Sequence, residues 1–535
     1  MAAKTKYPVG IQSFSKLRKE GYLYIDKTPL IYKIITEGCP YFLSRPRRFG
    51  KSLLISTLQA VFEGRRELFE AFTTEQGIEQ PQLFIARSDW RWEKYPVMRF
   101  DFSAGDMVDI EQLDTLIDAT LSDYESQYGL TSMVKDANIR MVNLLRTMHA
   151  QTGRRVVVLV DEYDNFILHA LGNEEKVMQA RQRLMNVFGP LKAEDDHLQL
   201  VFITGISKFS QMGIFSKLNN LKNISMAPAY ETLCGISEEE LTSQLRPDIE
   251  RLGEANGLSY AEQLAELKQM YDGYHFCERR TDIYNPFSLI NAFDLERVSN
   301  YWFASGTSRA VIEMLAQMPP ISIENINGVH CEATAFDNAF DSYVSPLPLL
   351  YQSGYLTIKD YDRELQDYTL GFPNLEVSRG FADCLYQHVT HRQFTADEDK
   401  SRLLRAYKFF RQDNDLPKFM EAIKTFFAGL PYQWARDNHN EHFYHALLYT
   451  LLVSFGADVV AEESSAKGQS DLVLRMPKGI YVMEIKFDDS VQAALDQIEQ
   501  KGYAQKYSLD ARPLTKVGIS FSSADRNIID WQAVQ

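Results

Sequence analysis

The N-terminal part of the chain alternates between short apolar runs and segments with helical spacing. Residues 41–43, 154–162 and 198–205 contain continuous apolar runs of strand length, and the β-branched run in 154–162 is typical of a strand buried on both faces of a parallel sheet. Residues 97–102 alternate between apolar and polar positions, which predicts another strand of this sheet. Residues 51–58 have apolar positions at helical spacing. The pattern predicts an α/β domain.

Helical and aromatic patterns replace these strands in the middle of the chain. Residues 238–274 are acidic with apolar residues at helical spacing, which predicts a helical lid. The segments 271–276 and 284–288 are rich in aromatic and turn-forming residues, and Pro286 breaks the chain before a new helix. We interpret them as the aromatic packing of the lid, in which His275 is a packed or surface histidine.

A helix followed by a strand hairpin is predicted for residues 349–374, with Gly354 at the turn and charged residues between the strands. This is the pattern of a winged helix, a module that binds DNA in some proteins and packs against an ATPase core in others. The scarcity of Lys and Arg favours packing over DNA reading. The next segment, 379–435, is charged and helical and predicts a connector.

The C-terminal part of the chain returns to strands. Residues 441–452 predict a strongly apolar helix, and 458–462 predict a strand. The runs 470–474 and 480–486 predict two strands joined by a short turn, so they form a hairpin. Residues 491–507 predict the helix that follows.

The overall composition excludes some classes of protein. At 535 residues the chain is too long for one core, and 45% hydrophobic with 24% charged residues is typical of a soluble globular protein. The net charge of -15 argues against a protein that coats nucleic acid, although a local basic groove needs only a few Lys and Arg. Residues 1–60 hold 11 Lys and Arg against 3 Asp and Glu. A nucleic-acid surface and a solvated face beside a phosphate pocket explain them equally well.

Cysteine usage and apolar runs indicate the cytoplasm. The 5 cysteines are scattered without a Cys-x-x-Cys or Cys/His cluster, which argues against structural zinc and a disulfide framework. Scattered reduced thiols fit a cytoplasmic protein. Residues 1–10 lack the apolar core of a signal peptide, and no apolar run approaches the roughly 18 residues that span a bilayer, so we expect no membrane partner.

A phosphate-binding loop is predicted where Gly50, Lys51 and Ser52 follow the strand at 41–43 and open a helix. Free N–H groups and the positive dipole end of that helix would face phosphate oxygens. Lys51 would reach the β- and γ-phosphates of ATP, and the Ser52 hydroxyl would coordinate Mg²⁺. Arg48 and Gly50 are the other loop residues that we expect to contact the nucleotide.

One position of this loop departs from the usual pattern. Arg45 stands where the first glycine is expected, and arginine adopts a left-handed backbone less readily than glycine. We therefore expect a wider loop, which puts nucleotide affinity or hydrolysis in doubt. The alternative interpretation of the motif is a helix-capping Ser52 after a basic turn.

Polar residues at the ends of two further strands support a nucleotide site. Asp161 and Glu162 end the strand at 154–162, at the edge of a parallel sheet where ligands bind. We expect Asp161 to hold Mg²⁺ and Glu162 to polarise the attacking water. Thr204, in the strand at 198–205, could sense the γ-phosphate. The loop, the acidic strand end and the polar strand end predict a P-loop NTPase core.

The C-terminal hairpin brings two carboxylates and a lysine together. Glu484 and Lys486 are two apart on one strand and share a face, and pairing places Asp471 of the other strand beside them. Two carboxylates bind a hard cation such as Mg²⁺, which stabilises charge on a scissile phosphate and lowers the pKa of an attacking water. Lys486 can orient that water or neutralise developing charge. The alternative interpretation is an exposed strand edge with alternating charges. It accounts for Glu484 and Lys486 but not for Asp471 beside them.

The flanking helices add residues to this candidate centre. Glu441, at the start of the helix 441–452, could hold a second metal ion or its water. Gln497, Lys501 and Tyr503 belong to the helix after the hairpin, where Gln or Lys can touch a substrate phosphate. Together these residues predict a metal-dependent nuclease centre.

This order of elements resembles the PD-(D/E)XK nuclease superfamily, especially its Holliday-junction-resolvase-like and restriction-endonuclease-like branches. The resemblance assigns Asp471, Glu484 and Lys486 to the D…ExK core. It assigns Glu441 to the acid of the N-terminal helix and Gln497 to the frequent glutamine of the following helix. The whole chain is similar to a bacterial family that joins an AAA-ATPase-like domain to such a nuclease domain. That similarity rests on residues 45–52, 161–164, 204–210, 271–274, 284–286 and the nuclease elements.

The patterns and the resemblance together predict an α/β multidomain protein. Its expected parts are an AAA-ATPase-like P-loop NTPase core with a parallel sheet at 1–235, a helical lid subdomain at 236–335, a winged-helix-like segment at 336–378, a helical connector at 379–435 and a restriction-endonuclease-like α/β domain at 436–535.

Three functions fit these predictions. The first is an ATP-regulated, Mg²⁺-dependent nuclease acting on DNA in preference to RNA, in which nucleotide at Lys51 sets domain arrangement or oligomer state, so a homo-oligomer is one outcome. The second is a nucleotide-dependent switch or scaffold whose nuclease-like domain only binds nucleic acid or a partner. The atypical Arg45 favours the second, whereas the complete set of Asp471, Glu484 and Lys486 favours the first. A DNA-binding regulator acting through the winged-helix-like segment is the third, and its few basic residues oppose it.

Overall fold

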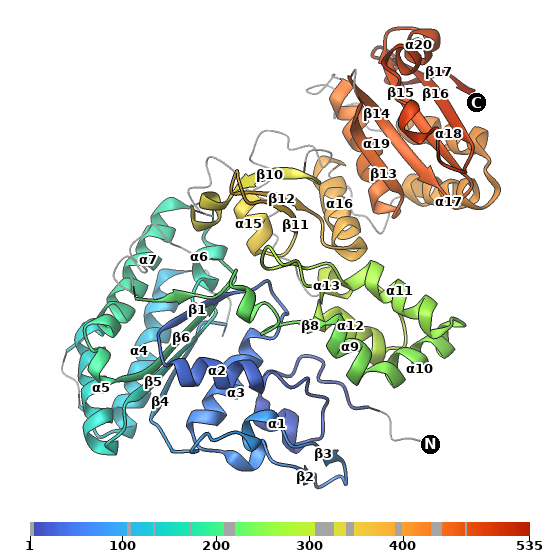
Figure 1. Ribbon diagram of the computed structural model, residues 1–535. Coiled ribbons are helices and arrows are strands. Elements are labelled where there is room, and N and C mark those ends of the chain that lie inside the picture. The colour runs from blue at the N-terminus through green and yellow to red at the C-terminus, as the bar shows by residue number, and fades with distance from the viewer. Residues whose placement is uncertain are drawn as a thin grey trace. The chain divides into compact units, whose positions relative to one another are not determined.

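The computed structural model describes residues 5–103, 109–131, 134–171, 173–207, 220–304, 326–338, 347–390, 398–429, 441–465 and 468–535. These residues form two compact units (Figure 1). The first comprises the described residues up to 304 together with 328–376, and the second consists mainly of residues 377–535.

A parallel sheet of five strands, in the order β4-β5-β6-β1-β7, forms the centre of the first unit. All six residues of β5 are buried, as its continuous apolar sequence predicts. The register pairs Phe42 with Ile203 and Val157 with Leu200, so the strand ends carrying the predicted polar residues meet at one edge. The strands are β1 (Tyr41–Ser44), β4 (Val97–Asp101), β5 (Val156–Asp161), β6 (Leu198–Gly205) and β7 (Lys222–Asn223). The predicted α/β sheet is confirmed.

Helices enclose this sheet. Three of them contribute buried residues such as Leu113, Leu144 and Leu184 to one apolar core with Met98 and Val158 of the strands. They are α4 (Ile110–Gln127), α5 (Ala137–Thr152) and α7 (Glu174–Phe188). The helix after the loop, α3 (Lys51–Phe62), contacts β5. The remaining elements here are α1 (Phe14–Lys19), α2 (Thr28–Glu37), β2 (Phe72–Thr73), β3 (Glu79–Gln80) and α6 (Asn165–His169).

A helical subdomain follows the sheet, coloured green in Figure 1. Its helices share an apolar core that includes Leu241, Leu252, Leu267 and Phe293. A two-stranded antiparallel ladder pairs Ile236 with Tyr284 at its base. The elements are β8 (Ile236–Ser237), α9 (Glu238–Gln244), α10 (Arg246–Asn256), α11 (Tyr260–Tyr271), β9 (Ile283–Tyr284), α12 (Pro286–Asp294) and α13 (Tyr301–Ala304). The helical spacing and the break at Pro286 predicted this arrangement.

The predicted helix and hairpin form at the end of the first unit. Gly354 has a φ of 87° and turns the chain after the helix, and the two following strands pair antiparallel, with Tyr361 opposite Tyr368. A third strand joins them in the order β10-β12-β11. The elements are β10 (Val329–Glu332), α15 (Leu347–Gln352), β11 (Thr357–Asp362) and β12 (Asp367–Gly371).

The second unit is built on a mixed sheet in the order β13-β14-β15-β16-β17. Strands β15 and β16 are parallel and all other neighbours are antiparallel, so the chain crosses over through α20 between them. The elements are β13 (Asp458–Ser465), β14 (Gly468–Met476), β15 (Gly479–Phe487), α20 (Val491–Lys501), β16 (Leu514–Ser522) and β17 (Asn527–Val534). The hairpin of β14 and β15 is the one that the sequence predicts.

Four further helices belong to or lead into this unit. They are α16 (Leu375–Thr390), α17 (Glu398–Asp413), α18 (Leu416–Ala428) and α19 (Glu441–Ser454). The ring of Phe410 lies 4.9 Å from that of Tyr481 on β15, and α18 contacts β17, so these helices pack against the sheet. Throughout the described parts of the chain, no helix combines the length and apolarity needed to cross a membrane.

Candidate functional site

The loop between β1 and α3 has the backbone of a phosphate-binding site. Gly50 is the N-cap of α3 with a φ of 91°, and Arg48 also has a positive φ of 68°. These left-handed residues turn the chain so that α3, with Lys51 as its first residue, begins directly behind the loop. The unpaired N–H groups at the start of this helix are available to an anion.

Lys51 lies across the loop and is 3% exposed. Its Nζ donates hydrogen bonds of 3.0 Å to the carbonyl oxygens of Arg45 and Pro46. An ammonium held by two neutral carbonyls can exchange them for phosphate oxygens, which offer it a stronger charge-assisted bond. The geometry is thus compatible with the predicted contact to the β- and γ-phosphates.

Arg45 fixes this loop to the backbone of the segment that contains Ser225 and Tyr230. Its guanidinium donates to the carbonyls of Ser225 (2.7 Å), Ser44 (2.9 Å) and Tyr230 (3.2 Å), and it lies 4.1 Å from the ring centre of Phe276. Arg45 does not have a positive φ. The wider loop is predicted because arginine adopts a left-handed backbone less readily than glycine, and this reason does not apply here. Arg45 instead makes a buried structural contact.

Asp161 and Thr204 meet at the ends of β5 and β6. Both are fully buried, and the Thr204 hydroxyl donates to Asp161 Oδ1 at 2.9 Å. Burial raises the pKa of Asp161, and the hydroxyls of Ser52 and Thr204 offset part of the rise. Thr204 therefore orients Asp161, and it does not line the cavity described below. Its predicted contact with a γ-phosphate stays a prediction.

The other oxygen of Asp161 fits a cation. Among the described residues Oδ2 has no hydrogen-bond partner, and the guanidinium of Arg99 approaches it only to 3.8 Å. A buried carboxylate oxygen beside the Ser52 hydroxyl is the donor set that Mg²⁺ takes next to a nucleotide. Sequence reasoning missed Arg99, because an arginine in an alternating strand carries no signal of its own.

Glu162 is held in a strained conformation at the edge of the sheet. Its φ of 51° is rare for a residue with a side chain, and the residue lines the cavity next to the loop. The following turn is fixed by Asp164, a buried carboxylate that accepts hydrogen bonds from the N–H groups of Ile206 (3.0 Å) and Ser207 (2.6 Å). Glu162 therefore lies at the cavity beside the loop, and its predicted role of polarising a water stays a prediction.

A cavity of about 620 Å³ opens in front of the loop, a volume that suits a nucleotide. Its lining includes Arg48, Gly50, Lys51, Ser52 and Glu162 among the predicted residues. The opposite wall comes from segments that sequence reasoning did not assign to the site, namely Pro8, Gly10, Ile11, Gln12, Pro286, Phe287, Trp302 and Tyr355. Among these segments, the turn before Pro286 carries a sequence signal, and the aromatic pattern around it predicts lid packing.

Trp302 connects the loop to the last part of the first unit. Its indole Nε1 donates to the Arg47 carbonyl at 3.2 Å, and its backbone N–H donates to Glu376 Oε1 at 2.8 Å. The hydroxyl of Ser288 holds the other oxygen of Glu376 at 2.7 Å. Glu376 lies in the first turn of α16, so the loop is linked to the helix that leads into the second unit.

In the second unit, the hairpin of β14 and β15 brings the predicted carboxylates together. The register pairs Leu472 with Met483, which places Asp471 opposite Glu484. The Asp471 N–H donates to Glu484 Oε2 at 3.4 Å, and Asp471 Oδ2 accepts from the Ile485 N–H at 2.6 Å. The two carboxylates are therefore neighbours, in the arrangement that a shared cation requires.

Glu484 is the most buried group of this centre, at 1% exposed. Lys486 Nζ donates to its Oε1 at 3.1 Å, and the Gln497 amide donates to the same oxygen. Burial, followed by the charge of Asp471, raises the pKa of Glu484 to about 7. Two neighbouring carboxylates that repel each other, of which Glu484 has the raised pKa, gain stability from a bound cation. The donor set fits a divalent metal.

Helix α20 reaches this centre because it approaches β16 closely. A Cβ atom at Gly518 would lie 2.7 Å from the Val491 carbonyl oxygen, so only glycine permits this contact. Glycine at this position lets Gln497 reach Glu484, and the Gln497 amide also donates to the Tyr503 hydroxyl at 3.3 Å. Sequence reasoning named Gln497 and Tyr503 but gave no role to Gly518.

Helix α19 supplies a residue that the sequence did not flag. His445 Nε2 donates to the Asp471 carbonyl at 2.8 Å and fixes the strand beside the carboxylates. Its only signal was its position one turn after Glu441. The helix does begin at Glu441, but the side chain of this residue lies outside the described residues, and its predicted role as a metal ligand stays a prediction.

Comparison with known proteins assigns two regions of the chain to families. Residues 8–215 match a family described as "Predicted AAA-ATPase", and residues 439–531 match the PD-(D/E)XK nuclease superfamily. The chain belongs to the family of proteins that join an AAA-ATPase-like domain to a PD-(D/E)XK nuclease superfamily domain. Over 539 residues it is 32% identical to a protein of Azotobacter chroococcum mcd 1, "Uncharacterized protein in vnfD 5'region", and the match covers 99% of both chains.

Proposed function

We propose that this protein is a Mg²⁺-dependent nuclease that cuts DNA in preference to RNA and is controlled by ATP. The observation that carries this proposal is the centre formed by Asp471, Glu484, Lys486 and Gln497. A scaffold without catalytic activity would not need two adjoining carboxylates, one of them buried beside a lysine. The domain that holds them matches the nuclease superfamily. The free thiols of the 5 cysteines support a cytoplasmic setting.

The roles of the residues follow from their positions. Asp471 and Glu484 would hold Mg²⁺, which when bound stabilises charge on the scissile phosphate and lowers the pKa of a water. Lys486, 3.1 Å from Glu484, would orient that water or neutralise the developing charge. Gln497 would contact the neighbouring phosphate from α20. The burial of Glu484 keeps bulk water from screening these charges.

The control by ATP rests on the cavity of the first unit. Lys51 would release its two carbonyls to the β- and γ-phosphates, while Ser52 and Asp161 would hold Mg²⁺. Glu162 would polarise the attacking water if ATP is hydrolysed. The hydrogen bond from Trp302 to the Arg47 carbonyl supports the regulatory part, because a loop that changes shape on binding phosphate would move this tryptophan.

A direct assay tests the proposal. The full-length protein is incubated with single-stranded, duplex and branched DNA and with RNA of matched sequence, with Mg²⁺ or Mn²⁺, and with or without ATP. We expect cleavage of DNA that requires the metal, changes with ATP and disappears in Glu484→Gln. Binding without cleavage of any substrate would instead indicate the switch or scaffold. Sedimentation with and without ATP measures whether nucleotide also changes self-association.

A further inference from the structure

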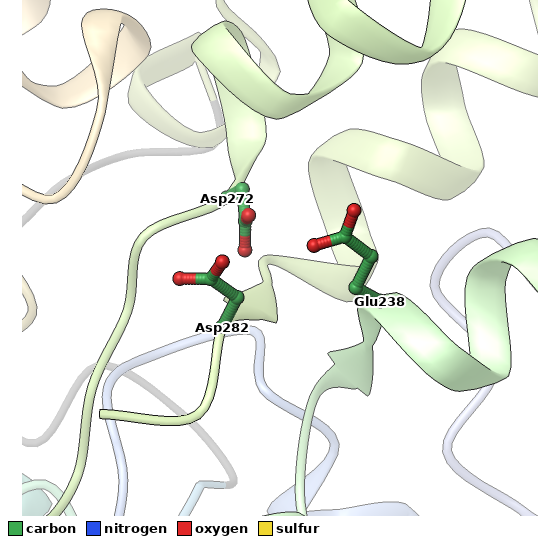
Figure 2. A group of neighbouring side chains, drawn as sticks. All are labelled: Glu238, Asp272 and Asp282. Carbon is green, nitrogen blue, oxygen red and sulfur yellow. The ribbon is translucent and has the colours of Figure 1, made fainter. Parts of the chain in front are cut away.

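Three acidic side chains meet in the helical subdomain, outside the cavity and outside the nuclease centre (Figure 2). Glu238 opens α9 directly after β8, Asp272 follows α11, and Asp282 precedes β9. Oxygens of all three carboxylates lie within 4.8 Å of one another. Within the described ranges, no other three Asp, Glu, His or Cys residues approach so closely. We call this group the lid triad.

The backbone brings these residues together by several contacts. The ladder of β8 and β9 pairs Ser237 with Ile283, which places the residues on either side of it next to each other. At Gly273 the φ is 84°, and a Cβ atom would lie 2.3 Å from the Pro373 carbonyl oxygen. The chain therefore passes Pro373 only with glycine at this position. The ladder thus positions Glu238 and Asp282, and the contact at Gly273 positions the residue before it, Asp272.

Asp272 is the residue of the lid triad whose carboxylate would gain most from a bound cation. It is 2% exposed, and among the described residues neither of its carboxylate oxygens makes a hydrogen bond of normal geometry. Figure 2 shows the carboxylate directed at the other two acids. Burying a carboxylate that accepts no hydrogen bond is costly, so a cation bound directly to this one would stabilise it. Burial raises the pKa of Asp272 to about 7, which agrees with a site that lacks its partner.

The cations nearby do not fill this need. Lys268 Nζ bonds to Glu238 (2.6 Å) and Asp282 (3.0 Å) but approaches Asp272 only to 3.8 Å. Its side chain is 45% exposed and can move into solvent. His275 Nε2 lies 2.9 Å from Asp282. The half-buried Lys359 interacts electrostatically with Asp272 and Asp282, but its ammonium donates to the Pro373 carbonyl. Lys268 is therefore the ammonium that bonds directly to carboxylates of the triad.

We propose that Glu238, Asp272 and Asp282 bind one divalent cation of the size of Ca²⁺, which takes the place of the Lys268 ammonium. Two ligands on opposite sides of Ca²⁺ are about 4.6–5.2 Å apart, so oxygens that lie within 4.8 Å of one another fit around this ion. Mg²⁺ takes ligands about 4.2 Å apart across the ion and demands near-octahedral geometry, whereas Ca²⁺ tolerates an irregular set of ligands. Glu238 and Asp282 are half-exposed, so water can complete the coordination.

The cation would serve as a structural clamp. It would join the start of α9, the end of α11 and the start of β9, and so reinforce the two ladder pairs of β8 and β9, the bridge from Tyr274 to Ile283 and the apolar core that these elements share. This role explains an acidic-aromatic segment that the nucleotide and nuclease proposals leave unused. It holds whether or not the protein hydrolyses ATP or cuts DNA.

The test is thermal unfolding and calorimetry of the full chain with CaCl₂ after removal of metal. Glu484→Gln and Ser52→Ala are introduced together as the background, so that neither other metal site contributes. We expect one Ca²⁺ per chain and a rise in Tm that Mg²⁺ does not reproduce at the same concentration. Asp282→Asn should abolish both effects. Asp360→Asn, an exposed aspartate paired with Arg280 in the same unit, is the matched control and should retain them.

Lys268→Met separates the proposal from a simple ion-pair network. If the triad binds Ca²⁺, removal of the competing ammonium should tighten binding roughly fivefold, and Ca²⁺ should restore the Tm that the substitution lowers. If the triad only serves Lys268, Ca²⁺ has no effect on the background protein or on Lys268→Met. The same Ca²⁺ response in Asp282→Asn as in the background protein would also overturn the proposal.

Discussion

Lys51 and Arg45 are basic residues of the same loop, and both are buried, but their contacts differ in kind. Lys51 makes two bonds to carbonyls that a phosphate can replace. Arg45 bonds to the carbonyls of the neighbouring Ser44 and of the distant Ser225 and Tyr230 and lies on the ring of Phe276, and a ligand would replace none of these contacts. Their substitutions should therefore separate binding from stability.

We expect Lys51→Ala to weaken ATP binding by about 10- to 100-fold, because it removes charge-assisted bonds worth about 1.5–3 kcal/mol, while the unfolding free energy changes little. Arg45→Ala should lower the unfolding free energy by about 3 kcal/mol, since it removes a buried side chain with its hydrogen bonds to the Ser225 and Tyr230 carbonyls and its contact with Phe276. Calorimetry with ATP and urea unfolding measure the two quantities. Equal ATP affinity in wild type and Lys51→Ala would remove the site from this loop.

Glu484 should make the stability of the metal-free protein depend on pH. Its pKa rises from 4.5 to about 7 on folding, so between these values the folded protein keeps a proton that the unfolded chain releases. The stability that this proton provides is fully present below pH 4.5 and is lost as the pH rises to about 7, a loss of up to about 3 kcal/mol.

Glu484→Gln isolates this effect, because glutamine stays neutral at every pH. Urea unfolding of both proteins at about pH 5 and about pH 8, without divalent metal, should show a larger decrease for the wild type. Asp272 also titrates near 7 but is common to both proteins and cancels in the difference. Parallel pH profiles would show that the folded-state pKa of Glu484 is not raised. Cleavage should rise with pH through about 7, because metal binds the ionised carboxylate.

At the scale of elements, the packing of α20 on β16 controls the nuclease centre. Gly518→Ala would place a methyl group 2.7 Å from the Val491 carbonyl, so α20 must shift and carry Gln497 away from Glu484. We expect a cost of about 1–3 kcal/mol in stability and reduced cleavage in a folded protein. The matched control is Gly479→Ala in β15, where the first contact is at 3.3 Å. Similar losses in both variants would contradict a specific role for the α20 contact.

The strands could be predicted from the sequence, but the contacts between segments far apart in the chain could not. The apolar run before Asp161 and the run 480–486 that contains Glu484 are local signals, and both strands form as expected. Trp302 contacts a carbonyl 255 positions away in the chain, and no local pattern encodes such a partner. Arg45 shows the same limit, since its deviation from the loop pattern predicts a wider loop, whereas the structure has it bonded to the distant carbonyl of Ser225.

For the whole molecule, the central question is whether the two units communicate. Asp471→Ala should remove metal-dependent cleavage and leave ATP binding intact, whereas Lys51→Ala should change cleavage without changing the metal site. Trp302→Phe removes the indole N–H that bonds to the Arg47 carbonyl, together with part of the buried ring, and keeps an aromatic side chain against Tyr355. If nucleotide acts through this contact, the variant should bind ATP normally but respond to it less in the cleavage assay. Identical cleavage with no nucleotide, with ATP and in Lys51→Ala would mean two independent modules.

The conformation of Glu162 implies that thermal stability and catalytic activity favour different residues at this position. A left-handed backbone costs a residue with a side chain about 1–2 kcal/mol, and this cost is present before any ligand binds. Glu162→Gly should therefore unfold at a higher temperature than the wild type while hydrolysing ATP more slowly, if hydrolysis occurs. Selection for heat resistance alone would favour the glycine, so a glutamate retained there would indicate that the reaction sets the composition of this turn.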